Sequence, residues 1–148
     1  MSLEQTISEA IKTAMREKDR VALDSLRAVK AQILLLQTEA RGAEVTAEQE
    51  IAILQRMIKQ RKDSYEQFTA QGRTDLAEVE EAQSKVIEKF LPKQLSADEL
   101  ESEIKKIISE TGAESLKDLG KVMSVASKAL AGKSDGKSIS EMVKKLLS

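Results

Sequence analysis

A single proline, Pro92, interrupts a chain whose apolar residues otherwise recur at helical spacing. Proline has no amide proton, and its ring disfavours helical backbone at the residue before it, here Leu91. On both sides of this point Ala, Leu, Glu and Lys are abundant, and Gln and Arg are frequent before it; all are strong helix formers. The sequence therefore predicts an all-α protein with an N-terminal domain at residues 1–92 and a C-terminal domain at residues 93–148.

The N-terminal half contains about four apolar stripes, which predict an antiparallel helical domain. Asp19 is expected to cap the second helix, Thr46 to open the third through a capping box with Gln49, and Thr74 to cap the fourth. Glycines after the second and third stripes are typical of helix ends. The residues expected on the buried sides of the third and fourth helices are Ile51, Leu54, Ile58, Tyr65, Phe68, Leu76, Val79, Val86, Ile87 and Phe90.

The C-terminal half has the pattern of a small three-helix domain. Its first helix should begin after Ser96, because a capping box with Glu99 and a hydrophobic staple between the flanking leucines coincide there. That helix is expected to end at Gly112. Two further helices are predicted at residues 115–130 and 138–147, each with its own apolar stripe.

The composition narrows the possible chemistry. The chain has no cysteine and no histidine, so disulfides, soft metal ligation and histidine acid–base catalysis are excluded. The adjacent acids Glu80 and Glu81 face about 100° apart on a helix and have no nucleophile beside them. We expect no catalytic residue, no metal and no cofactor. Because no apolar run approaches about 20 residues and the N-terminus is polar and acidic, a cytoplasmic protein without membrane contact is predicted.

Charge is distributed unevenly within the C-terminal half. Residues 96–114 contain six acids and two lysines, whereas residues 115–148 contain seven lysines and three acids. The balance therefore moves from −4 to +4 within one small domain, although the net charge of the whole chain is only −1. Such a domain can meet RNA on one side only.

Three lysines of the helix at residues 115–130 share one face at 100° per residue, opposite an apolar stripe. From the pattern alone, a solvated face opposite a core stripe is the favoured interpretation, because such faces are ordinary in amphipathic helices. Gly120, inside the same helix, favours a close approach of the backbone either to a neighbouring helix or to a ligand. The lysines on this face are Lys117, Lys121 and Lys128.

Lys133 follows Gly132 in a segment that superficially matches the end of a phosphate-binding P-loop. The full pattern requires glycine at position 127, where this chain has Ser127, and a strand where this chain has a helix. We therefore predict no nucleotide site. The preferred interpretation is that Gly132 ends one helix and Asp135-Gly136 forms a turn into the next, with Lys133 on an exposed bend. A cation on such a bend can still bind a backbone phosphate without catalysis.

The third predicted helix carries a second cluster of cations. Arg61 occupies its apolar seam, where an ion pair with Asp63 or Asp24, or a guanidinium that snorkels between helices, would explain it. A role in binding is the alternative. This secondary candidate site comprises Arg56, Lys59, Arg61 and Lys62.

Several segments resemble proteins of tRNA-dependent amidation. Residues 118–123 (Asp-Leu-Gly-Lys-Val-Met), residues 132–136 (Gly-Lys-Ser-Asp-Gly) and the closing amphipathic helix resemble the tail domain of the B subunit of the tRNA-dependent amidotransferase (GatB). Residues 59–64 and 91–96 resemble the standalone YqeY relatives of that tail. The resemblance covers nearly the whole chain.

This resemblance implies a connection with the transamidation of mischarged tRNA, in which glutamine supplies the amide nitrogen. The chain lacks the catalytic body of the full subunit and has no means of binding ATP and magnesium. The chain alone is therefore not expected to be an enzyme. A carbon–nitrogen ligase label would be inherited from the family. We expect a non-catalytic module whose partner is folded tRNA, or an amidotransferase or synthetase subunit. A helical protein-interaction module without RNA binding is the alternative. Because aromatics are scarce, phosphate contacts to folded RNA are favoured over base stacking.

Overall fold

The computed structural model describes residues 2–148, which form seven α-helices and one short 3-10 helix and contain no strand. The prediction of an all-α protein is confirmed. The chain divides into two compact units beside its proline: the N-terminal unit ends at Leu91, and the C-terminal unit extends from Pro92 to Ser148. No helix within residues 2–148 combines the length and the apolar character needed to cross a bilayer.

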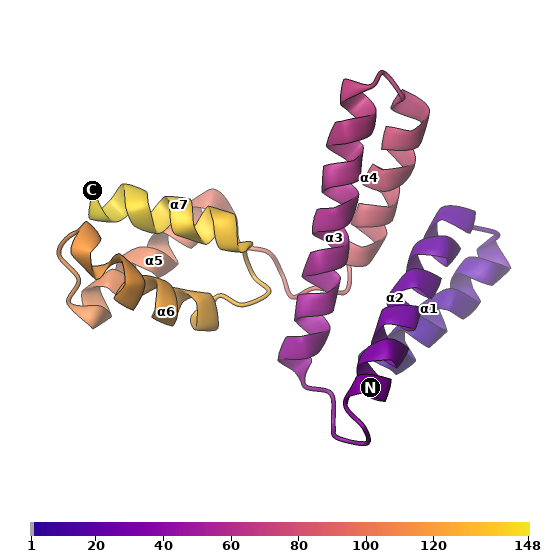
Figure 1. The fold of residues 1–148 in the computed structure, drawn as a ribbon, viewed down its shortest axis with the longest axis horizontal. Helices are drawn as coiled ribbons and strands as arrows, with labels where there is room; N and C mark the ends of the chain where they lie inside the picture. The colour runs from indigo at the N-terminus through magenta and orange to yellow at the C-terminus, as the bar shows by residue number, and fades with distance from the viewer. Residues whose placement is uncertain (1) are drawn as a thin grey trace. The chain divides into compact units, whose positions relative to one another are not determined.

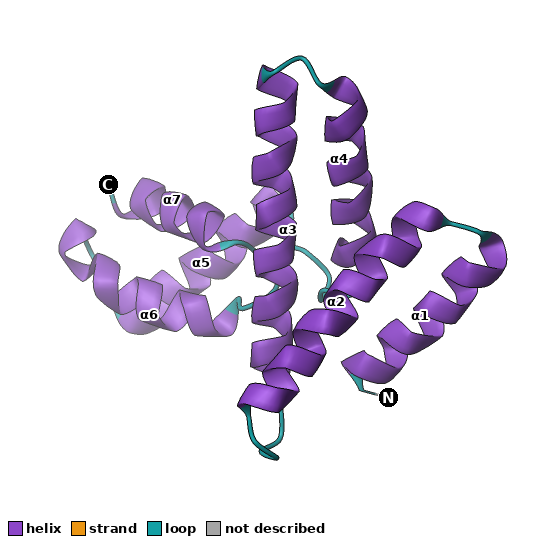
Figure 2. Cartoon of the chain, turned by 45° about the vertical axis from the view of Figure 1, so that its right-hand side comes forward, coloured by secondary structure: helices purple, strands orange, loops and turns teal. Residues whose placement is uncertain are grey.

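The N-terminal unit consists of two helical hairpins (Figure 1). Helix α1 (Leu3–Glu17) packs against α2 (Arg20–Glu39), and α3 (Ala47–Ala70) packs along α4 (Thr74–Glu88). Helix α4 also contacts α2, which joins the hairpins. The connections between α1 and α2 and between α3 and α4 are short, so each pair is antiparallel (Figure 2).

In the N-terminal unit, two of the three cap residues predicted from the sequence cap their helices in the structure. The Asp19 side chain accepts a hydrogen bond from the amide of Ala22 at 3.1 Å. Thr46 and Gln49 form both bonds of the predicted capping box. The predicted Thr74 cap is wrong: the helix begins one residue earlier than that role requires, with Thr74 as its first residue and no side-chain cap.

The core of the N-terminal unit is almost entirely aliphatic, as the shortage of aromatics requires. It draws mainly on α2 and the first half of α3. Tyr65 and Val79, which the sequence pattern places on buried faces, are 37% and 42% exposed. On α4, Val79 is exposed because the helix turns Ala77, Ser84 and Ile87 inward instead. The buried core residues are Ile7, Ala14, Leu26, Val29, Ile33, Ile53, Leu54, Met57, Ile58 and Ile87.

The C-terminal unit contains the three helices that the sequence predicts. They are α5 (Ala97–Thr111), α6 (Leu119–Ala129) and α7 (Gly136–Leu147), and each contacts the other two (Figures 1 and 2). A 3-10 turn, η1 (Leu116–Asp118), precedes α6. The buried residues that form its aliphatic core are Leu100, Ile104, Ile107, Val122, Ala126, Leu130, Ile139, Val143 and Leu147.

The first helix of the C-terminal unit starts and stops as the sequence indicates. Ser96 and Glu99 form the reciprocal capping box, and Gly112 ends the helix in the left-handed conformation at φ 70°. The hydrogen bond with Ser96 lowers the pKa of the Glu99 carboxyl. The other two helices of this unit do not begin where the sequence predicts. The segment from Ser115 opens as a 3-10 turn before α6, and α7 begins at Gly136, with Asp135 as its cap, instead of at residue 138.

We expect the excised segment 92–148 to fold without the N-terminal unit, because its caps and its core are all internal to it. Circular dichroism with thermal melting should show a helical spectrum and one cooperative transition. Replacing the buried Ile104 with alanine should destabilise the fragment by about 2–5 kcal/mol. A coil-like spectrum or a non-cooperative melt would show that the core needs surface from the N-terminal unit.

Candidate functional site

The bend between α6 and α7 is tied to the segment that follows the proline. The side-chain amide of Gln94 donates hydrogen bonds to the carbonyls of Gly132, at 2.6 Å, and Pro92, at 2.8 Å. The backbone amide of Leu95 donates to the carbonyl of Lys133 at 2.9 Å. We call this set of hydrogen bonds the Gln94 clamp. Two of the segments that carry the family resemblance, residues 91–96 and 132–136, therefore meet at one place in the fold.

The clamp fixes the backbone from which Lys133 extends. Gly132 is buried and has a φ of 77°, a left-handed conformation that disfavours any residue with a Cβ. The amide of Lys133 donates to the carbonyl of Leu130 at 3.0 Å, while its own carbonyl is held by Leu95. The residue itself is exposed. A cation is thus presented to solvent from a bend whose backbone hydrogen bonds are satisfied.

Helix α6 presents two more of the predicted lysines. Val122, Ala126 and Leu130 face the core, whereas Lys121 and Lys128 are exposed. These lysines are seven residues apart, which corresponds to about 10.5 Å along a helix axis. They therefore offer two cations spaced along one rigid element.

Lys117 is also exposed, but it lies in the 3-10 turn η1 and not in a continuous α-helix. A 3-10 turn advances about 120° per residue in place of about 100°. The uniform helical spacing expected for residues 115–130 does not hold across this turn. A shared face for Lys117, Lys121 and Lys128 therefore stays a prediction.

The positive charge of this region is not neutralised by neighbouring acids. All five ion pairs within residues 2–148 lie between Glu9 and Lys105, so none of the four predicted lysines of the C-terminal unit has a carboxylate within 4.0 Å. Two nearby acids accept hydrogen bonds from backbone amides instead. Asp118 accepts a hydrogen bond from the amide of Glu114 at 2.9 Å, and Asp135 accepts one from the amide of Ser138 at 3.3 Å. The region keeps cations available for an external anion.

Gly120 is not explained by helix packing. A Cβ built at this position meets no atom within 4 Å in the described part of the chain. The residue lies at the exposed start of α6, between Leu119 and Lys121. The interpretation that a neighbouring helix approaches this glycine is therefore wrong, and the open backbone beside Lys121 is accessible to a ligand.

The second cluster of cations lies on α3, and three of its four side chains form hydrogen bonds or ion pairs within the chain. Arg61 donates to the side-chain oxygen of Gln83 and to the carbonyl of Met57, both at 3.3 Å. The predicted ion pair with Asp63 or Asp24 is wrong, because a neutral amide from α4 occupies that place. Among its neighbours, Lys62 pairs with Glu88 at 3.5 Å and Arg56 donates to Gln32 at 3.2 Å, while Lys59 is exposed.

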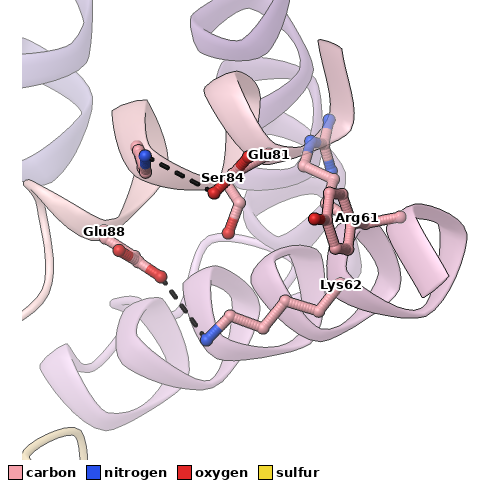
Figure 3. A pocket seen from close by; sticks show the side chains of 7 residues that line it. Arg61, Lys62, Glu81, Ser84 and Glu88 are labelled. Atoms are coloured by element: carbon pink, nitrogen blue, oxygen red, sulfur yellow. Dashed lines mark ion pairs between the residues drawn. The ribbon is translucent and has the colours of Figure 1, made fainter. Parts of the chain in front are cut away.

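Sequence reasoning missed one residue beside this cluster. Ser84, on α4, is only 4% exposed, and its hydroxyl has no hydrogen-bond partner within the described chain. It lines a pocket of about 220 Å³ between α3 and α4 that also includes Arg61 and Lys62 (Figure 3). A serine in the middle of an amphipathic helix gives no signal of burial, so only the fold reveals it.

Comparison of the amino-acid sequence with known proteins finds a matching family and several relatives. A family model described as Yqey-like protein matches residues 4–147. Two relatives are named "Altered inheritance of mitochondria protein 41, mitochondrial". The protein from Meyerozyma guilliermondii is 35% identical over 91 residues, which cover 58% of this chain and 44% of the relative. The protein from Lachancea thermotolerans is 29% identical over 99 residues, covering 67% of this chain and 53% of the relative.

The chain spans about half the length of the curated relatives it matches. Their names also correct one expectation. The sequence pattern predicts a cytoplasmic protein, but these relatives are named as mitochondrial proteins, so that prediction is wrong. Its argument failed because neither the lack of a long apolar run nor a polar N-terminus identifies the compartment in which a protein resides.

We expect Gln94→Ala to destabilise the C-terminal unit by about 1 kcal/mol, because two carbonyls, one of them on the buried Gly132, lose their side-chain donor. Denaturant unfolding of the fragment 92–148 measures this change. Lys93→Ala is the matched control, since Lys93 is exposed and makes no hydrogen bond or ion pair within the described chain. Equal stability of the two variants would mean that the two side-chain hydrogen bonds of Gln94 contribute nothing to stability.

Proposed function

Because this chain belongs to the family of Yqey-like proteins, we propose that it is a non-catalytic module that binds folded tRNA through the lysines of its C-terminal unit. The observation that supports this proposal most strongly is the set of exposed lysines without carboxylate partners, held on a helix and on a clamped bend. The proposed contact residues are Lys117, Lys121, Lys128 and Lys133.

Lysines suit phosphate contacts that set position without reading sequence. Each lysine that meets a phosphate releases condensed counterions, which gives affinity at low salt. Stacking of unpaired bases on aromatic side chains can contribute little to RNA affinity here, since the chain has one tyrosine, two phenylalanines and no tryptophan. The preferred RNA is therefore one whose folded backbone presents phosphates at fixed spacings.

The proposed role in the transamidation of tRNA follows from the resemblance to the amidotransferase tail. A tail that holds tRNA supports transamidation by positioning the substrate, while the chemistry belongs to other subunits. The chain contains no cysteine or histidine that could release ammonia from glutamine. We therefore attribute any ligase activity to a partner and not to this chain.

A protein-docking role is the second candidate, and one observation favours it. Leu116 is 51% exposed and Val125 is 40% exposed, both in the segment that carries the lysines. Exposed apolar side chains of this kind can pack into a groove of an amidotransferase or synthetase subunit. An apolar interface would be tolerant of salt, whereas phosphate contacts weaken steeply as salt rises.

For the double variant Lys121→Ala plus Lys133→Ala, we expect weaker binding of different tRNAs to about the same extent. The slope of log affinity against log salt should fall by about 2, because two phosphate contacts are lost. Fluorescence anisotropy across a salt series measures both quantities.

Two double variants serve as controls for that experiment. Lys105→Ala plus Lys106→Ala changes exposed lysines of the same unit, one of which already pairs with Glu101 at 3.3 Å. Arg56→Ala plus Lys59→Ala changes the cluster on α3. Unchanged binding after loss of Lys121 and Lys133, with a large loss in the α3 variant, would move the RNA site to the N-terminal unit.

We also expect the purified chain alone to show no glutaminase, ATPase or amidotransferase turnover, because its sequence has no cysteine, no histidine and no phosphate-binding loop. The assay is glutamine-dependent ammonia release compared with a heat-treated sample. Release that disappears when a residue of this chain is mutated would contradict the proposal.

A further inference from the structure

The pocket between α3 and α4 has features of a binding site that the RNA proposal does not use. It has a volume of about 220 Å³ and lies in the N-terminal unit, near the middle of the helical hairpin. Figure 3 shows charged side chains from both helices around it. The residues that line it are Arg61, Lys62, Tyr65, Glu81, Ser84, Lys85 and Glu88.

The charges of this pocket do not balance. Lys62 pairs with Glu88, and Lys85 pairs with Glu81, each at 3.5 Å. Arg61 is the third cation and has no carboxylate within 4.0 Å in the described chain. The lining therefore carries an excess of one positive charge, located on Arg61.

Arg61 keeps hydrogen-bonding capacity for a ligand. Its Nε donates to Gln83 and its Nη1 to Met57. A guanidinium has five N–H donors, so these two contacts leave three of them uncommitted. The same two contacts fix the side chain, which reduces the entropy lost when it binds an anion.

Ser84 supplies a second donor at the base of the pocket. Its hydroxyl oxygen is buried without a partner in the described chain and, in Figure 3, points towards the gap between Lys62 and Glu88. A buried hydroxyl without a hydrogen bond costs free energy, yet it does not bond to the carbonyl one turn before it as helical serines commonly do. An acceptor from a ligand would satisfy it.

The Lys62–Glu88 ion pair, which lines the pocket together with Ser84, is formed by exposed side chains. The side chains of Lys62 and Glu88 are 64% and 40% exposed, and ion pairs at such exposure are weak. An incoming anion can replace Glu88 as the partner of Lys62. The ligand would then be held by Lys62, Arg61 and Ser84 from two helices.

We propose that the α3–α4 pocket, formed around Arg61 and Ser84, binds a small molecule through one carboxylate or phosphate group. An anionic group complements the excess positive charge of the lining, and a pocket of about 220 Å³ has room for a small molecule. Both groups present oxygens that accept from a guanidinium and a hydroxyl. The proposal is independent of RNA binding, which uses the C-terminal unit.

The test titrates the full ¹⁵N-labelled chain with inorganic phosphate or with acetate, at ionic strength held constant with sodium chloride. We expect saturable shifts of backbone amides near positions 61 and 84 with at least one of the anions, and the tighter one identifies the group. Arg61→Gln and Ser84→Ala should each weaken that binding about tenfold, because a hydrogen bond to a charged group is lost. Arg73→Gln is the matched control, since Arg73 is an exposed arginine of the same hairpin that already pairs with Asp75 at 3.2 Å.

Thermal melting without added anion distinguishes a binding role for Ser84 from a structural one. Ser84→Ala removes an unpartnered hydroxyl, so its melting temperature should equal or exceed that of the unchanged chain. A lower melting temperature, shifts linear in anion concentration, or equal affinity in the Ser84→Ala and Arg73→Gln variants would overturn the proposal. A loss of tRNA affinity in Arg61→Gln as large as in the Lys121 and Lys133 double variant would also overturn it, by making the pocket part of the RNA site.

Discussion

Burial of aliphatic stripes is the constraint on which the whole structure depends. Isolated helices of 11–24 residues, the lengths of the seven in this chain, have little or marginal stability in water, so each must cover its apolar face with a neighbour. Without tryptophan and with three other aromatics, the chain uses Ile, Leu, Val and Ala for this purpose. Two separate aliphatic cores result, one in each unit, and the candidate binding cations are positioned by helices or bends anchored to them.

The Gln94 clamp links this packing to the candidate RNA surface. Burial of Val122, Ala126 and Leu130 orients α6 so that Lys121 and Lys128 remain exposed. The clamp then holds the bend that follows α6 through the carbonyls of Gly132 and Lys133. Two segments of the family resemblance thus have a structural reason for occurring together, whether or not either one contacts a ligand.

Sequence patterns predicted the features that depend on nearby residues. The capping boxes at Thr46 and Ser96 and the helix end at Gly112 rest on contacts over a few residues, and they were found as expected. Errors in where helices begin, such as the Thr74 cap, are local. The other errors and omissions concern contacts between residues that are distant in the sequence. Arg61 bonds to Gln83 across the hairpin, and the clamp joins positions 38 residues apart. The burial of Ser84 likewise depends on how α4 packs, which periodicity alone does not specify.

The most direct test of lysine-mediated RNA binding is an NMR titration of the ¹⁵N-labelled full chain with a folded tRNA at low and at high salt. We expect amide signals of residues 117–133, including that of Gly120, to shift at low salt and to return towards their free positions as salt is added. Signals of residues 56–62 should stay unchanged. Shifts confined to residues 56–62, or shifts around Leu116 and Val125 that persist at high salt, would contradict binding through the C-terminal lysines.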